Sequence, residues 1–64
     1  MYKLFKRAKN KVVLDNDSKI VKTDSVFKFP VGKIVNQFDL INAGYRFVLS
    51  ANDLEIIDNI KDVE

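Results

Sequence analysis

Residues 2–23 read YKLFKRAKNKVVLDNDSKIVKT, and this stretch decides the fold of the chain. Apolar and polar side chains alternate over residues 2–7, which predicts a strand with Tyr2 and Leu4 on one face and Phe5 on the other. A second strand is predicted over residues 11–15, whose apolar side chains follow one another directly. The polar residues 8–10 between the two strands are expected to form a turn.

The polar residues 15–18, Asp-Asn-Asp-Ser, carry the strongest hairpin signal in the chain. Asn and Asp tolerate the left-handed backbone that tight hairpin turns require. Residues 19–23 are therefore predicted to return as a third strand. Residues 25–29 alternate in a similar way, so we expect a fourth short strand whose inner face holds Phe27 and Phe29 and which ends at Pro30.

A helix is predicted over residues 31–43, because proline at residue 30 is well placed to begin one and Gly44 is suited to the left-handed position after its end. The apolar positions that share one face of this helix are Ile34, Val35, Phe38 and Ile41. Leu40 falls on the opposite, polar face. We expect Leu40 to be exposed there, either as an isolated surface leucine or as a contact for a protein partner.

Two further elements are predicted near the end of the chain. Residues 45–50 alternate as a strand, with one face that carries Tyr45, Phe47 and Leu49. Beyond it, Asn52 is suited to cap a helix, and Glu55 stands at the capping-box position three residues later. The apolar face of this helix would carry Ile56, Ile57, Ile60 and Val63. The alternative is that residues 54–58 form a strand paired with the preceding one.

Together these elements predict a single α+β domain that spans residues 1–64. Its small antiparallel sheet is built from the N-terminal β-meander plus the later strand at residues 45–50. The sheet is expected to pack against one central helix, residues 31–43, with a C-terminal helix beside it. A domain of 64 residues buries only about 60% of the surface of its unfolded chain. A homodimer is therefore an open alternative to a monomer.

The composition argues against catalysis and against bound groups. The chain contains no Cys and no His, which removes a common nucleophile and the usual proton shuttle at neutral pH. The commonest soft metal ligands are missing for the same reason. Two glycines in the whole chain do not make a glycine-rich phosphate loop. We therefore predict that the protein is not an enzyme and has no cofactor and no metal site.

The two halves of the chain carry opposite charge. Residues 1–33 hold nine bases against three acids, whereas residues 34–64 hold two bases against six acids. A basic half of this kind favours polyanions or acidic protein surfaces. The candidate contacts with a nucleic acid or an acidic partner are the bases of the first hairpin: Lys3, Lys6, Arg7, Lys9 and Lys11. Tyr2 and Phe5 lie among them and would offer rings for stacking.

By elimination, we expect a non-catalytic binding protein that acts by stoichiometric contact with a protein partner, as a regulator or inhibitor. Leu40 is the candidate residue for that protein interface. Two alternatives stay open, a nucleic-acid-binding module that uses the basic N-terminal hairpin and a structural subunit of a larger assembly. No apolar run exceeds three residues, so no membrane contact or export signal is predicted and a cytoplasmic location is expected. The Lys- and Asn-rich composition is typical of small phage-like reading frames.

Overall fold

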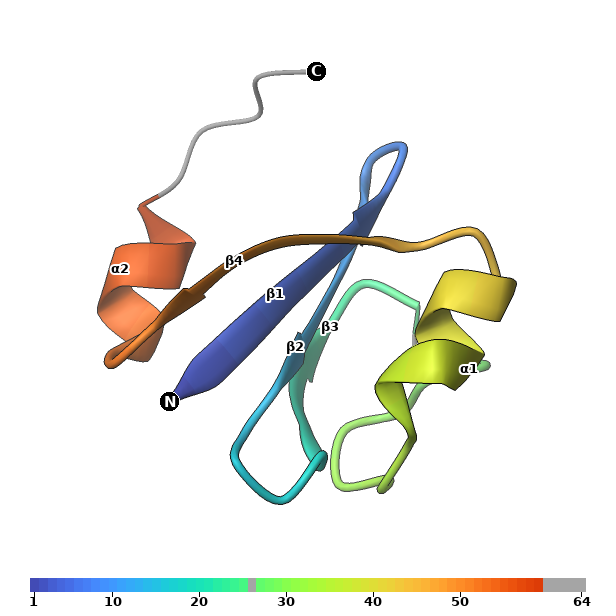
Figure 1. Ribbon diagram of the computed structural model, residues 1–64, viewed down its shortest axis with the longest axis horizontal. Helices are drawn as coiled ribbons and strands as arrows, with labels where there is room; N and C mark the ends of the chain where they lie inside the picture. The colour runs from blue at the N-terminus through green and yellow to red at the C-terminus, as the bar shows by residue number, and fades with distance from the viewer. Residues whose placement is uncertain (26, 60–64) are drawn as a thin grey trace.

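The structure, a computed structural model, describes residues 1–25 and 27–59. It shows an α+β fold in which an antiparallel sheet of four strands, in the order β3-β2-β1-β4, carries two short helices (Figure 1). The predicted fold class is thereby confirmed. The elements are, in chain order, β1 (Tyr2–Arg7), β2 (Asn10–Leu14), β3 (Ile20–Thr23), α1 (Gln37–Asn42), β4 (Arg46–Ala51) and α2 (Leu54–Asp58).

The predicted β-meander forms the middle and one edge of the sheet. β1 and β2 are joined by a tight turn in which Ala8 has a φ of 51°. β2 and β3 are joined by the predicted polar turn, where Ser18 adopts a left-handed φ of 62°. The Asp15 carboxylate accepts hydrogen bonds from the backbone N–H groups of Asp17 and Lys19, at 2.8 and 3.0 Å. These bonds fix the turn that sets β3 beside β2.

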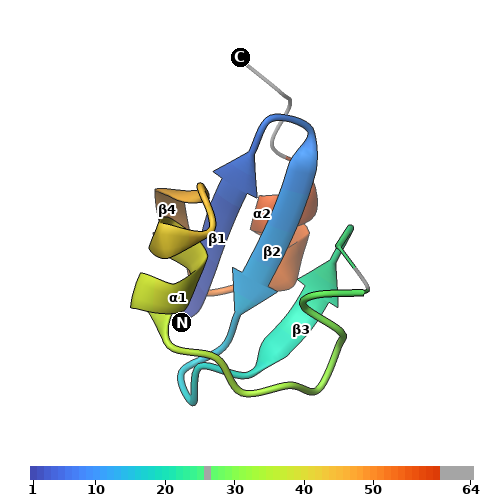
Figure 2. The same cartoon turned by 90° about the vertical axis from the view of Figure 1, so that its right-hand side faces the viewer.

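The sheet is buried on both faces, because its inner strands carry large apolar side chains on each side. The face toward α1 holds the larger core, which consists of Phe5, Val12, Leu14, Ile20, Phe29, Val35, Leu40 and Tyr45. The face toward α2 holds a smaller core, which consists of Leu4, Val13, Ala51 and Ile57. Figure 2 shows the two helices on opposite sides of the sheet. Leu4 and Phe5 therefore point to opposite faces, as predicted.

Residues 25–29 do not form the predicted fourth strand. Val26 lies outside the described residues, and the others form a turn in which the Phe29 N–H donates to the Ser25 carbonyl at 2.8 Å. Phe27 is 99% exposed, whereas Phe29 is buried with its ring centroid 5.6 Å from that of Tyr45 in an edge-to-face contact. The predicted two-phenylalanine inner face is wrong, because a turn does not keep the alternation of a strand.

The helix predicted over residues 31–43 is wrong in its first half. The segment before α1 runs beside the start of β3 instead, where the Ile20 N–H donates to the Lys33 carbonyl at 2.8 Å. A bridge between Lys19 and Ile34 belongs to the same pairing. Backbone groups that are bonded to the sheet cannot also form helical hydrogen bonds. The predicted central helix is therefore reduced to the six residues of α1.

The start of α1 determines which of its sides faces the core. The Asn36 side chain caps the helix by accepting a hydrogen bond from the Phe38 N–H at 2.9 Å. The residues on the inner side are spaced three apart: Gln37, Leu40 and Ala43. Leu40 has 0% exposure, so the expectation that it lies on the surface and contacts a partner is wrong. Gly44 follows with a φ of 97°, as predicted.

β4 forms one edge of the sheet and contains a bulge that the alternating pattern did not predict. Leu4 pairs with Leu49 and Phe5 pairs with Phe47, so Val48 is an extra residue on β4. A bulge displaces the alternation of side chains beyond it. Leu49 therefore packs against the α2-side core, whereas Phe47 makes an edge-to-face contact with Phe5 on the α1 side. The predicted common face of the large side chains of this strand is wrong.

α2 confirms the favoured helix over the alternative strand. Asp53, rather than the predicted Asn52, is its N-cap residue and makes no side-chain capping bond. Ile57 is buried in the α2-side core, whereas Ile56 is 51% exposed. Ile60 and Val63, which were also predicted on the apolar face of this helix, lie outside the described residues. Neither described helix has the length and apolar character needed to cross a membrane.

Candidate protein-interaction surface

The five bases predicted as polyanion contacts lie on both faces of the sheet. Side chains alternate along a strand, so bases at odd and even positions of β1 point in opposite directions. Lys3 and Arg7 share the α1 side with Phe5, Lys6 and Lys11 share the α2 side, and Lys9 lies in the turn between β1 and β2. Phe5 is 1% exposed and so offers no ring for stacking. The first hairpin therefore lacks a single basic face with interleaved aromatic rings.

Three bases from different strands do form a row on the α2 side. Lys6 lies directly opposite Lys11 of β2 and directly opposite Arg46 of β4. Sequence reasoning missed Arg46, because its neighbours in the row are distant in the chain. Like charges that face each other across strands are destabilising. Lys6 is only 8% exposed, and each of the three residues has an interaction partner within the molecule. Because Lys6, in the middle of the row, is buried, the row does not offer three bases to a phosphate backbone.

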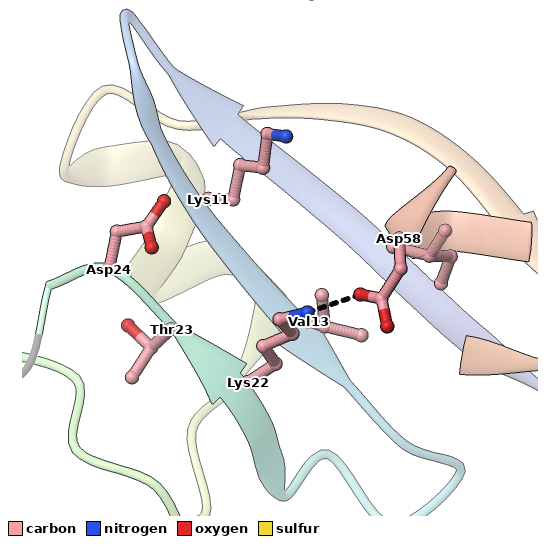
Figure 3. A pocket seen from close by; sticks show the side chains of 7 residues that line it. Lys11, Val13, Lys22, Thr23, Asp24 and Asp58 are labelled. Atoms are coloured by element: carbon pink, nitrogen blue, oxygen red, sulfur yellow. Dashed lines mark hydrogen bonds and ion pairs between the residues drawn. The ribbon is translucent and has the colours of Figure 1, made fainter. Parts of the chain in front are cut away.

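A small cavity of about 130 Å³ lies between α2 and the strands β2 and β3 (Figure 3). Val13 and Ile57 form its apolar part, and Lys22 of β3 makes an ion pair with Asp58 of α2. Pockets that hold small-molecule ligands are usually about 300–1,000 Å³, so this cavity is too small for most of them. This ion pair links a base of the basic first half of the chain to an acid of the acidic second half. The two halves are therefore in contact at this point of the folded protein.

The outward side of α1 carries two large exposed apolar side chains beside polar ones. Phe38 is 61% exposed and Ile41 is 47% exposed, and their spacing of three residues puts them on the same side of the helix. Ile34, just before the helix, is 69% exposed. Of the four side chains predicted to face inward, only Val35 is buried. We refer to Ile34, Phe38 and Ile41 as the α1 apolar surface.

A shallow groove of about 490 Å³ borders this surface at Ile34. Lys3 of β1 and Asp17 of the β2–β3 turn contribute polar groups to the groove. An apolar centre with a polar rim is the usual composition of a protein–protein contact. The arrangement can therefore accept apolar side chains of another protein on α1 and polar groups beside them.

The sequence contains one signal that would have corrected the predicted start of this helix. Asn36 is a strong N-cap residue, and a helix that begins at the next position has Leu40, rather than Phe38 and Ile41, in the middle of its Gln37–Ala43 side. Within residues 1–25 and 27–59, no group of three or more His, Cys, Asp or Glu side chains is placed to hold a metal ion.

Comparisons of the chain with protein-family models, with curated proteins and with solved structures gave no match.

Proposed function

We propose that this chain is a non-catalytic cytoplasmic binding protein that acts by stoichiometric contact with a protein partner, as a regulator or inhibitor. The α1 apolar surface is the observation that supports this function. Soluble proteins rarely leave contiguous large apolar side chains exposed, and such patches often mark sites of interaction. Burial of apolar area is favourable by about 25 cal/mol per Å². The proposed contact residues on α1 are therefore Phe38 and Ile41, which are exposed, in place of Leu40, which is buried.

Replacing both Phe38 and Ile41 with aspartate is expected to abolish capture of the partner. Carboxylates in an apolar contact lose hydration without gaining a partner, so retention of the captured protein should fall at least about tenfold. The measurement is affinity capture by the purified 64-residue chain from cells that encode it, followed by mass spectrometry. The mass of the isolated complex gives its stoichiometry.

Ile56→Asp provides the matched control for this experiment. Ile56 is also a half-exposed isoleucine on a helix, but α2 covers the opposite face of the sheet. This variant should retain the partner in the same ratio as the wild-type chain, and circular dichroism should show that all variants are folded. Equal capture by the wild-type chain and the Phe38→Asp/Ile41→Asp variant would refute the proposal, as would the absence of any stoichiometric partner.

The nucleic-acid alternative has one observation in its favour, the row of Lys11, Lys6 and Arg46. We expect weak binding at most, because the bases of the first hairpin point to two faces. Binding to mixed DNA and RNA should be measured at about 50 and 200 mM salt, where a protein with six to ten phosphate contacts loses about 10³–10⁵ in affinity. Because Lys6 is buried, only Lys11 and Arg46 are left to contact phosphates, and two contacts predict a loss of only about tenfold. A loss near the larger figure would favour the nucleic-acid function instead.

A further inference from the structure

β4 presents an open edge of the sheet. It is the last strand in the order β3-β2-β1-β4, and among the described residues it pairs with β1 alone. The opposite edge is partly covered, because the Gly32 N–H donates to the Ile20 carbonyl and the Ile20 N–H donates to the Lys33 carbonyl, both at 2.8 Å. Figure 2 shows β3 and β4 at the two ends of the sheet. The outward backbone groups of β4 can therefore serve as a template for another strand.

The side chains of β4 also suit pairing with another strand. The strand contains no Lys and no Pro, which natural edge strands use to prevent such pairing. Phe47 is 52% exposed and Val48 is 42% exposed. The bulge at Val48 increases the local twist and shortens the stretch over which a second strand can pair. Contacts between side chains must therefore supply part of the stability of any interface at this edge.

We propose that β4 pairs antiparallel with β4 of a second copy of the chain about a two-fold axis, so that the two sheets become continuous. In an antiparallel pair of identical strands, the first residue of one copy lies near the last residue of the other. The Arg46 end of each copy is then set against the Ala51 end of its partner. The axis then passes between Val48 and Leu49, so that Val48 of each copy lies opposite Leu49 of the other and buries apolar area there, while Phe47 lies opposite Ser50.

The distribution of charge at the ends of β4 selects a second copy as the occupant. Arg46 begins the strand, and Asp53, the N-cap of α2, follows its last residue by two positions. Arg46 lies opposite Lys6, on the side of the sheet that α2 covers. A two-fold axis perpendicular to the sheet keeps this side on the same face in both copies. Asp53 of each copy therefore approaches Arg46 of the other, and the symmetry gives two such contacts per dimer.

The size of the domain supports the same assembly. A chain of 64 residues gains little stability from its own core, and association is one of the usual ways to supplement it. The β4 edge does not include the α1 apolar surface. The dimer is consequently independent of the proposed function, and α1 stays available to a different protein when the two copies are joined.

Charge reversal at the two ends of β4 tests the dimer. The oligomeric state of the full chain should be measured by sedimentation or light scattering as a function of protein concentration, which governs self-association. Arg46→Asp and Asp53→Arg should each raise the dimer dissociation constant at least about tenfold, because each change acts twice in a symmetric interface. The double variant Arg46→Asp/Asp53→Arg should restore the dimer dissociation constant to within about threefold of the wild-type value.

Two further variants locate the interface. Val48→Asp should weaken the dimer, whereas Phe38→Asp should leave it unchanged. The proposal is overturned if the wild-type chain is a monomer at concentrations of about 100 μM and below, if either reversal leaves dimerisation unchanged, if the double variant dimerises no better than the single ones, or if Phe38→Asp dissociates the dimer. Should Val48→Asp fail to fold, the reversals at the exposed residues Arg46 and Asp53 still decide the question.

Discussion

Replacing Leu40 with alanine is expected to lower the free energy of unfolding by about 2–5 kcal/mol. Leu40 is fully buried in the α1-side core, in the same cluster as Phe29, Val35 and Tyr45. Its carbonyl also accepts a hydrogen bond from the Tyr45 N–H at 2.9 Å, so the surrounding backbone has little freedom to fill the cavity that alanine would leave. The change is measured by urea unfolding of the purified chain.

Ile41→Ala is the matched control, since isoleucine and leucine have the same number of carbon atoms and the two residues are adjacent. Ile41 is 47% exposed, and its replacement should cost less than about 1 kcal/mol. The total stability expected for 64 residues is about 3–10 kcal/mol, so a loss at the upper end of the expected range unfolds Leu40→Ala, and an unfolded variant agrees with the prediction. Equal losses from the two replacements would show that α1 does not face the sheet through Leu40.

Replacing Phe29 with alanine should have an effect of similar size, about 3–5 kcal/mol. The Phe29 side chain is 8% exposed and packs edge-to-face on Tyr45, with the ring planes at 86°. Its loss opens a cavity in the α1-side core and removes the aromatic contact as well. The shift in the midpoint of urea unfolding, at an unchanged slope, gives the loss of stability directly.

Phe27 provides the comparison for this second change. It has the same side chain two positions earlier in the chain, yet it is 99% exposed. Phe27→Ala should therefore change the free energy of unfolding by no more than about 0.5 kcal/mol. If both replacements proved equally damaging, residues 25–29 would have to place the two rings on one inner face, as a strand does, and the turn seen here would be incorrect.

Much of the sheet could be predicted from local sequence, because its signals lie within a few residues of one another. Leu4 and Phe5 occupy opposite faces simply because side chains alternate along a strand. The β2–β3 turn follows from Asp15, whose carboxylate binds backbone donors two and four residues later. The β4 bulge has no such local signal, since the extra residue is defined only by the register against β1.

The candidate interaction surface could be predicted only in part. A helical pattern shows that Phe38 and Ile41 lie on one side and Leu40 on another, but it does not show which side meets the sheet. The pairing of the Ile34 segment with β3 and the cap at Asn36 made that choice. The basic residues of the first hairpin were divided between two faces for a related reason, since alternation along β1 separates Lys3 from Lys6.

The amino-acid sequence by itself determined the α+β class, the β-meander and the presence of two helical segments, because alternation, turn residues and helix caps act over a few neighbouring positions. Only the tertiary structure decided that Leu40 is buried, that Phe38 and Ile41 are exposed, and that β4 forms an open edge. Those outcomes depend on hydrogen bonds and packing between segments that are distant in the chain. Several arrangements satisfy the same local pattern there, and the burial of the two cores selects among them.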